Sequence, residues 1–404
     1  DTRDCTFTMD DGIYRLAWKW TLEARLTLSW DEPGGSAAAS AAPCDAFWYT
    51  LGSTATLAAT SSPGYAFTVW SGDVADDRSL DNPLDVVMDA AKTLACGFQA
   101  APPGGQRFTW TGGGTDNKWY NTANWTNDTG ENGLPVVGDT VEFPGDAGTI
   151  LLDRPTAALK RFTLSGGTTL LATNWTTAVY AGTVTIESNA VATCAGPFSD
   201  RFTATIQSID MTNRVWFVCT DFNLEAGAVI DVDGKGYGES PAISSSAARC
   251  YGPGGSAYDR CGGGHGGVGY KYARGTLLSQ EYDSAEEPSA PGSSGGVAGR
   301  ASYCRPGGGV VRIAAAGTAK LDGTITARGI AGNLYGGAGS GGAVWISAQK
   351  ITADGGIIRV SGGDGHDSSL PNSGGGGRLA LHYDPAGQSA ADIAALALDA
   401  APGT

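Results

Sequence analysis

The segments GGGVVRIAAAGTAKLDGTITARG (residues 307–329) and GGAVWISAQKITADGGIIRVSGG (residues 341–363) decide the fold, because the same order of glycines and short apolar runs returns after 33 residues. A third glycine-led run, at 377–381, follows after a further 35 residues. Repetition at a nearly fixed period indicates stacked units. Short strands without helices between them predict an all-β chain, in which a small β-rich module precedes a parallel β-solenoid with glycine-rich loops.

Glycine is concentrated in one part of the chain, since 38 of the 62 glycines lie between residues 234 and 377. Glycine weakens strands and helices through its unfolded-state entropy, so this density needs a backbone reason such as a tight turn, a positive φ or a close approach of chain segments. The glycines have no strict three-residue period, which argues against a collagen-like helix. We therefore expect each glycine run to form a corner or loop between stacked strands.

Composition shifts and internal similarity divide the chain into modules. The run at 7–20 shares with 85–98 an order of strand, short turn and strand, so the first residues are expected to be the end of an incomplete repeat. The predicted segments are the incomplete repeat 1–20 with its candidate donor strands, a complete β repeat at 21–100, a linker at 101–106, the opening coils of the solenoid at 107–233, a glycine-rich insertion at 234–306, glycine-rich coils at 307–388, and a short helix and tail at 389–404.

A family resemblance covers about eighty residues, from 21 to 100. The residues that carry it are GYAF (64–67), WSGD (70–73), NP (82–83), MD (88–89) and a closing Phe98. This pattern resembles the divergent internalin-type repeat of bacterial surface proteins. In that family, small β-rich modules are strung in tandem as spacers or adhesive stalks, so the resemblance implies a protein secreted to a bacterial cell surface.

A second resemblance begins after the linker. The residues that carry it are FTWTG (108–112), Trp119, NW (124–125), Pro135 and GDTVEF (138–143). This run of about 35 residues resembles the first segment of autotransporter-associated and related β-helical surface proteins. In those proteins the segment usually opens a parallel β-solenoid, which agrees with the period of the later coils.

The charge balance limits the partners of the chain. Its formal net charge is −15, and its lysines and arginines form no cluster. A phosphate-binding surface needs clustered cations, which argues against nucleic acid as a partner. No apolar run approaches the roughly 18 residues of a membrane span. The composition fits a secreted, extracellular or cell-surface protein, and Asp1 is expected to be a processed end.

The eight cysteines are even in number and lack the Cys-x-x-Cys spacing of zinc sites. In a secreted chain this favours disulfides over scattered free thiols. Connectivity does not follow from the spacing. Cys44 with Cys96 is one candidate pair, and Cys250 with Cys261 or Cys304 is another.

Two carboxylate pairs are candidates for a hard cation, and calcium is the ion that fits oxygen ligands best. Asp364 and Asp367 lie in a run that matches the start of the calcium-binding nonapeptide repeat, although it is a single copy with Ser368 at an apolar position. The second candidate group is Asp231 and Asp233 together with Glu239 beside the insertion, and Asp231 and Asp233 alternate along a strand and therefore point to one face. Solvated loops and turns are the alternative for both pairs, and no other cofactor is expected.

The insertion carries the residues that catalysis would need. Insertions in a solenoid emerge on one face, which is often the working one. In an enzyme, His265, Glu286 and Arg274 would supply a base, a carboxylate and a charge-neutralising cation for cleaving a polysaccharide. His265 has no triad spacing, however, and a glycine-flanked histidine is most often a loop residue.

Three Asn-x-Thr sequons, at Asn124, Asn127 and Asn174, would be glycosylation sites in a eukaryotic secreted chain. In a bacterial protein Asn124 is better explained as part of the Asn-Trp motif of its module.

Together these patterns predict a structural protein, either a cell-surface stalk or adhesin or a self-assembling fibre subunit. Strands without their sheet leave backbone groups unpaired, so residues 1–20 are expected either to fold onto their neighbour or to join copies of the chain into a filament. The alternative is a polysaccharide-binding or polysaccharide-degrading β-helix enzyme with a carbohydrate ligand. A third reading is a passenger domain exported to the outer surface.

Overall fold

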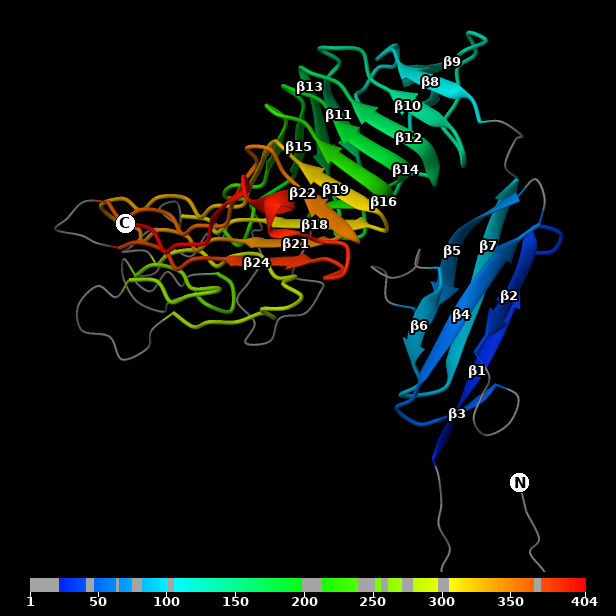
Figure 1. Cartoon of the computed structure of the whole chain (residues 1–404), viewed down its shortest axis with the longest axis horizontal. Helices are drawn as coiled ribbons and strands as arrows, with labels where there is room; N and C mark the ends of the chain where they lie inside the picture. Colours follow the sequence, from blue (N-terminus) through cyan, green and yellow to red (C-terminus); the bar gives the residue numbers. More distant parts are fainter. Residues whose placement is uncertain are drawn as a thin grey trace, which may run out of the picture. The chain divides into compact units, whose positions relative to one another are not determined.

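The chain folds into two compact units, residues 1–100 and 101–404 (Figure 1). The computed structural model describes residues 22–40, 47–62, 65–74, 82–100, 105–197, 213–238, 251–255, 261–270, 279–296, 305–366 and 372–404. These residues form β-strands and two short 3-10 helices, and they contain no α-helix. The predicted all-β fold is therefore confirmed.

The first unit consists of two small sheets around one core. Its strands are β1 (Glu23–Trp30), β2 (Gly35–Ala39), β3 (Trp48–Thr50), β4 (Thr54–Ser61), β5 (Tyr65–Gly72), β6 (Leu84–Val87) and β7 (Lys92–Ala100). They are ordered β3-β1-β7-β5 in one sheet and β2-β4-β6 in the other. In β1, buried Ala24 and Leu26 alternate with exposed residues, so one face of the strand enters the core with Trp70 and Leu94.

The second unit is a parallel β-solenoid. One long sheet has the order β24-β21-β18-β16-β14-β12-β10-β8-β9, and the facing sheet has the order β11-β13-β15-β17-β20-β23-β25. Every pairing along these two paths is parallel except that of β9 with β8. Strands β19 and β22 extend the long sheet beside β16.

The bounds of the solenoid strands are β8 (Arg107–Trp110), β9 (Trp125–Asn127), β10 (Thr140–Glu142), β11 (Gly148–Leu152), β12 (Leu159–Leu164), β13 (Thr168–Ala172), β14 (Val179–Ile186), β15 (Val191–Cys194), β16 (Val215–Leu224), β17 (Val229–Asp231), β18 (Val310–Ala315), β19 (Thr318–Leu321), β20 (Thr324–Thr326), β21 (Ala343–Ser347), β22 (Lys350–Thr352), β23 (Ile357–Arg359), β24 (Arg378–His382) and β25 (Ala397–Asp399). Each coil adds one strand to each sheet. The inward side chains of successive coils therefore stack in columns between the sheets.

An aromatic cluster closes the first end of the solenoid. Trp119 and Trp125 meet edge to face with centroids 4.6 Å apart, and both pack against Phe143. The indole of Trp125 donates to the carbonyl of Trp119 at 2.6 Å. Antiparallel β9 pairs with β8, so the edge of β8 is not open at this end of the solenoid. We call the cluster of Trp119, Trp125 and Phe143 the aromatic cap.

The glycine runs form a bundle of extended segments, which we call the glycine lobe (residues 234–238, 251–255, 261–270, 279–296, 305–309, 327–342, 360–366, 372–377 and 400–404). Figure 1 shows them as long loops without arrows that run side by side away from the coils. The amides of residues 339, 340, 341 and 342 donate in turn to the carbonyls of Ile330, Ser293, Gly375 and Ala327. The donors thus visit three neighbouring segments and return to the first after three residues, as in an extended helix of three residues per turn.

The lobe confirms the expectation that the glycine runs form loops between stacked strands, and it shows why these loops need glycine. A Cβ on Gly339 would lie 1.9 Å from the Pro306 carbonyl oxygen, and one on Gly374 would lie 1.9 Å from that of Gly339. At these glycines the neighbouring backbone is too close for a side chain. Elsewhere in the lobe, small side chains such as those of Ser293, Ser340 and Ala338 are completely buried between segments.

The expected C-terminal helix is limited to one turn. Residues Ala390–Ile393 form a 3-10 helix, η5, and Asp392 accepts hydrogen bonds from the amide and hydroxyl of Ser389 at 2.8 Å each. The chain then enters β25, which pairs with β23. Pairing of β25 with β23 stabilises this segment more than an α-helix would, although its alanines favour a helix.

Candidate functional site

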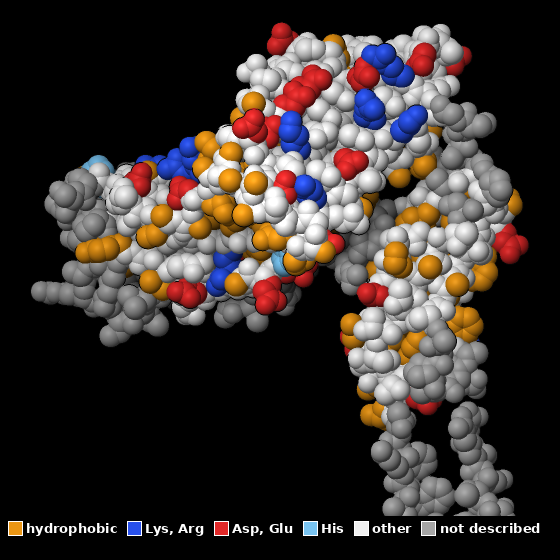
Figure 2. Space-filling view, in the orientation of Figure 1, with side chains coloured by type: hydrophobic (Ala, Val, Ile, Leu, Met, Phe, Trp, Pro, Cys, Tyr) orange, Lys and Arg blue, Asp and Glu red, His pale blue; other side chains and the backbone are white. Residues whose placement is uncertain are grey.

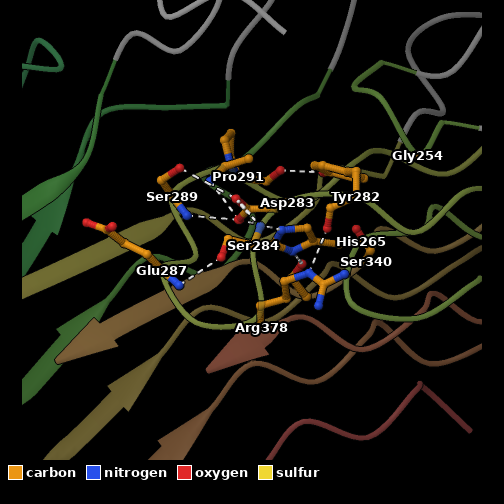
Figure 3. A network of polar contacts seen from close by, with 12 residues as sticks. Gly254, His265, Tyr282, Asp283, Ser284, Glu287, Ser289, Pro291, Ser340 and Arg378 are labelled. Carbon is orange, nitrogen blue, oxygen red and sulfur yellow. Dashed lines mark hydrogen bonds and ion pairs between the residues drawn. The ribbon is translucent and has the colours of Figure 1, made fainter. Parts of the chain in front are cut away.

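The described part of the insertion is joined to the coils through one polar network, drawn in Figure 3. Its centre is residues 281–291, which we call the docking loop. Asp283 has a φ of +71°, and its carboxylate accepts hydrogen bonds from the amides of Ser284, Ser289 and Ala290 at 2.9, 2.8 and 2.9 Å. The carboxylate therefore closes the docking loop on itself.

His265 links this carboxylate to the glycine lobe. Its side chain is completely buried, with Nδ1 2.8 Å from the Gly341 carbonyl oxygen and Nε2 3.3 Å from Asp283 Oδ2. Both ring nitrogens thus lie within hydrogen-bond distance of an oxygen atom. Burial pushes the pKa of Asp283 upward, but the hydrogen bonds from His265 and from the backbone outweigh it and hold this pKa below its usual value.

Tyr282 lies against the histidine ring and has a partner at each polar atom. The two ring centroids are 4.6 Å apart. The tyrosine hydroxyl donates to the Pro291 carbonyl at 2.5 Å and accepts from Ser293 Oγ at 2.9 Å, while Arg378 Nε donates to the tyrosine carbonyl at 2.6 Å. Burial raises the pKa of Tyr282 well above its usual value. The side chain is thus a neutral structural anchor.

The outer part of the docking loop lies on the solenoid sheet. Arg312 of β18 places its guanidinium 4.1 Å from the ring centroid of Trp345 on β21 and donates to Glu287 at 2.9 Å. His382 of β24 brings Nε2 to 2.6 Å from the Glu286 carbonyl oxygen. Together with Arg378 of β24, these contacts attach the loop to two coils of the solenoid, through β18 and β24.

The structure describes two of the three predicted catalytic residues. His265 is buried and paired with Asp283, whereas the Glu286 side chain is exposed, and Arg274 lies outside the described residues. The sequence missed the roles of Asp283, Tyr282 and Arg378. Arg378 is 96 residues from its partner, and no local pattern indicates such a contact.

The predicted cation ligands are engaged in turns and between coils. Asp233 accepts from the Thr326 hydroxyl at 2.5 Å and from the Arg328 amide at 2.6 Å, and its own amide donates to Asp231 at 2.9 Å. Burial raises the pKa of Asp233 against the effect of these hydrogen bonds. The pair therefore ties one coil to the next.

Asp364 is engaged in a similar way. It accepts from the amide and hydroxyl of Thr404 at 3.0 Å each, and these bonds lower its pKa. Asp367 lies outside the described residues. The described part of the chain contains no cluster of three or more metal-ligating side chains.

Two of the sequon asparagines act in turns, and the third lies inside the aromatic cap. The Asn124 side chain is fully buried, donates to the carbonyls of Asp116 and Lys118 at 2.9 Å each and accepts from the Gly114 amide at 2.8 Å. Asn127 caps a turn by accepting from the Glu131 amide at 2.8 Å. Asn174 donates to the Asp153 carbonyl at 2.5 Å. A glycan on Asn124 would have to displace the bonds that hold the cap together.

No disulfide joins any two of the cysteines in the described residues. Cys96, Cys194 and Cys219 are buried free thiols, and burial raises the pKa of Cys194 to about 12. This outcome corrects the expected Cys44–Cys96 pair. Cys261 is buried in the lobe, while Cys44, Cys250 and Cys304 lie outside the described residues. Cys96 occupies an inward position of β7 and packs as a small apolar side chain.

Comparison with known families gives one match. Residues 32–102 match the family described as the divergent InlB B-repeat domain, which supports the internalin-type resemblance of the first unit. No curated protein and no solved structure matches the chain. No described helix is long and apolar enough to cross a membrane.

Proposed function

We propose that this chain is an extracellular structural protein of a bacterial surface, a stalk or adhesin, or the subunit of a fibre. The observation that carries the proposal is the docking loop, in which the acid, base and phenol of the insertion are used for internal hydrogen bonds. A catalytic base must reach its substrate, and the exposed fraction of the His265 side chain is 0%. His265, Tyr282 and Asp283 therefore act as structural contacts that hold the docking loop in a scaffold.

The architecture supports the same proposal. A parallel solenoid grows by adding coils and gives a stiff body whose length is set by the number of repeats. The glycine lobe adds a second region held by backbone hydrogen bonds from several segments. The match of residues 32–102 to a divergent InlB B-repeat supports a location at a bacterial surface, because modules of this family are expected to serve as spacers there.

Self-association through residues 1–20 is part of the proposal. An incoming strand needs a long, unblocked edge. Among the described edge strands of the first unit, β5 is the longest at eight residues, and it pairs with β7 only. Val69 on β5 is 37% exposed and offers an apolar contact. A donor strand laid along β5 would extend the four-stranded sheet into the next copy.

Electron microscopy and light scattering of the purified chain test this proposal. We expect ordered filaments from the whole chain and none from a chain that lacks residues 1–20, with the same far-UV circular dichroism for the remaining unit. Filaments that persist after this deletion would refute linkage through the first strands.

The rival enzyme function has a separate test. Incubation with a panel of acidic and neutral polysaccharides should release no product, and His265→Ala should lower stability without changing this result. Product release by the wild-type chain that is abolished by Glu286→Gln would favour the enzyme.

A further inference from the structure

The docking loop is closed at a stem whose hydrogen bond involves no ionised group. At this stem the Tyr282 hydroxyl donates to the Pro291 carbonyl at 2.5 Å, and the Tyr282 ring lies against His265. Burial raises the pKa of Tyr282 well above its usual value, so the hydroxyl stays neutral. Residues 283–290, which we call the loop tip, extend from the stem to the solenoid sheet (Figure 3). The stem can therefore hold the two ends of the loop tip together at acidic pH.

The loop tip is acidic, and the part of the sheet that it contacts is basic. The tip contains no lysine, arginine or histidine, and its acidic residues are Asp283, Glu286 and Glu287. Strands β18, β21 and β24 contain no aspartate or glutamate, and their basic residues are Arg312, Arg378 and His382. Figure 2 shows acidic, basic and histidine side chains close together around β24. The tip and the sheet are therefore complementary in charge, as two surfaces of a specific interface are.

Asp283 is the acidic residue that makes the most contacts in the loop tip. Its carboxylate accepts from the amides of Ser284, Ser289 and Ala290, so it joins the first residues of the tip to the last. Its Oδ2 also lies 3.3 Å from Nε2 of the completely buried His265. The other ionisable groups at this place interact with Tyr282, and they are Tyr237 in the lobe and Arg378 on β24. Because an ionised acceptor forms hydrogen bonds about twice as strong as a neutral one does, protonation of Asp283 weakens all four contacts.

The other contacts of the loop tip lie at its outer end. Glu287 accepts from Arg312 at 2.9 Å, but the Glu287 side chain is 60% exposed. The Glu286 carbonyl oxygen lies 2.6 Å from Nε2 of His382. An exposed ion pair contributes little to stability, because solvent screens it. The tip is therefore held mainly by the Asp283 carboxylate, and acid removes the charge of this carboxylate without breaking the stem.

We propose that the loop tip is an acid-operated strap, which opens away from β18 and β24 when Asp283 is protonated, while the stem and the coils stay folded. Opening leaves His265 without the carboxylate that faces it, and it leaves Arg312 on the Trp345 ring without its acidic partner. The chain then presents different side chains in neutral and in acidic surroundings. This device does not depend on the proposed filament linkage through residues 1–20.

Hydrogen exchange of the whole chain, corrected for the intrinsic exchange rate at each pH, tests the strap. The folded pKa of Asp283 lies below the ordinary value of about 3.9, so the tip should be closed above that pH and should open as the pH falls through the folded pKa. Between about pH 5 and about pH 3 we expect the protection of the Ser289 and Ala290 amides to fall by at least about 10-fold. The amides of β16 should keep their protection.

Two variants separate the strap from general unfolding by acid. Asp283→Asn should lower the protection of the loop tip already at the higher pH and should abolish its further fall in acid. Glu287→Gln is the matched control, because it removes an exposed acid from the same tip, and it should keep the fall. Equal circular dichroism at the higher pH shows that both variants fold. The proposal is overturned if protection of the wild-type tip does not change with pH, if it falls together with that of β16, or if Glu287→Gln alone abolishes the fall.

Discussion

The solenoid and the glycine lobe solve the same packing problem in opposite ways. In the solenoid, neighbouring strands are separated by a normal sheet spacing, and large inward side chains such as Phe217 and Phe222 fill the space between the sheets. In the lobe, backbones approach so closely that the space for a side chain is already taken by another carbonyl. The first region depends on apolar burial, and the second depends on satisfied backbone hydrogen bonds.

This contrast shows that the repeat of the coils can continue into the glycine lobe, where the alternation of inward and outward side chains is absent. In the later coils the chain leaves the sheets at the end of one strand, crosses the lobe and returns to begin the next strand, as between β20 and β21 and between β23 and β24. The lobe segments therefore follow one another in the same order as the coils that they connect. The docking loop then joins the lobe to the solenoid through Arg312 of β18 and through Arg378 and His382 of β24.

The substitution with the largest expected effect removes a side chain from the solenoid core. Phe222→Ala should lower the free energy of unfolding by about 3–5 kcal/mol, because Phe222 is completely buried and its ring would leave a cavity. Chemical denaturation measures this loss, and hydrogen exchange should locate it in β16 and its neighbours. Phe222→Leu serves as the conservative control and should cost much less.

The substitution with the next largest expected effect adds a side chain to the glycine lobe. Gly339→Ala should cost about 3 kcal/mol, because its methyl group would lie 1.9 Å from the Pro306 carbonyl oxygen. Exchange should quicken in the lobe while the aromatic cap stays protected. Gly387→Ala is the matched control, since its nearest contact would be 3.9 Å away. Equal stability of the two variants would contradict the close packing described for the lobe.

A smaller effect is expected from a substitution that weakens the hydrogen bonds of the docking loop. Asp283→Asn should cost about 2 kcal/mol at neutral pH through weaker hydrogen bonds to His265 and to the loop amides. The folded pKa of Asp283 lies below its unfolded value of about 3.9, so its ionisation stabilises the fold above that pH.

This contribution is lost as the pH falls through the folded pKa. The stability difference between wild type and Asp283→Asn, measured by urea denaturation, should therefore shrink below about pH 4. A difference independent of pH would show that the ionised carboxylate is not what holds the loop.

The smallest effect concerns the outer face of the docking loop. Glu287→Gln should cost less than about 1 kcal/mol, because the Glu287 side chain is 60% exposed and its bond to Arg312 is screened by solvent. Thermal melting at low and high salt should give nearly equal temperatures for both proteins. A large loss would mean that the loop is held mainly by its surface ion pair.

The sequence predicts the coils well because their signals are local. The glycine-led apolar runs at 309–313 and 342–346 correspond to β18 and β21, and alternation within each run gives the inward residues. Strand β13 and the three-residue strand β25 carry weak signals and depend on pairing with neighbouring coils. Local propensity cannot reveal such pairing.

The candidate site was predictable only in part. The sequence draws attention to the insertion and to His265, but the partner carbonyl at Gly341 lies 76 residues away. The sequence around a histidine in a glycine run is the same whether its side chain is exposed in a loop or buried between segments. Its role is determined by the packing of the lobe, which follows from backbone contacts that leave no side-chain pattern.

The aromatic cap also bears on the order in which the molecule is made. Residues 108–143 leave the ribosome before any coil that stacks on them, so the growing chain has a finished template before the first coil arrives. Each later coil can therefore pair with a strand edge that has already formed. Damage to the Trp119–Trp125 pair should therefore slow refolding of every subsequent coil more than equal damage near β24.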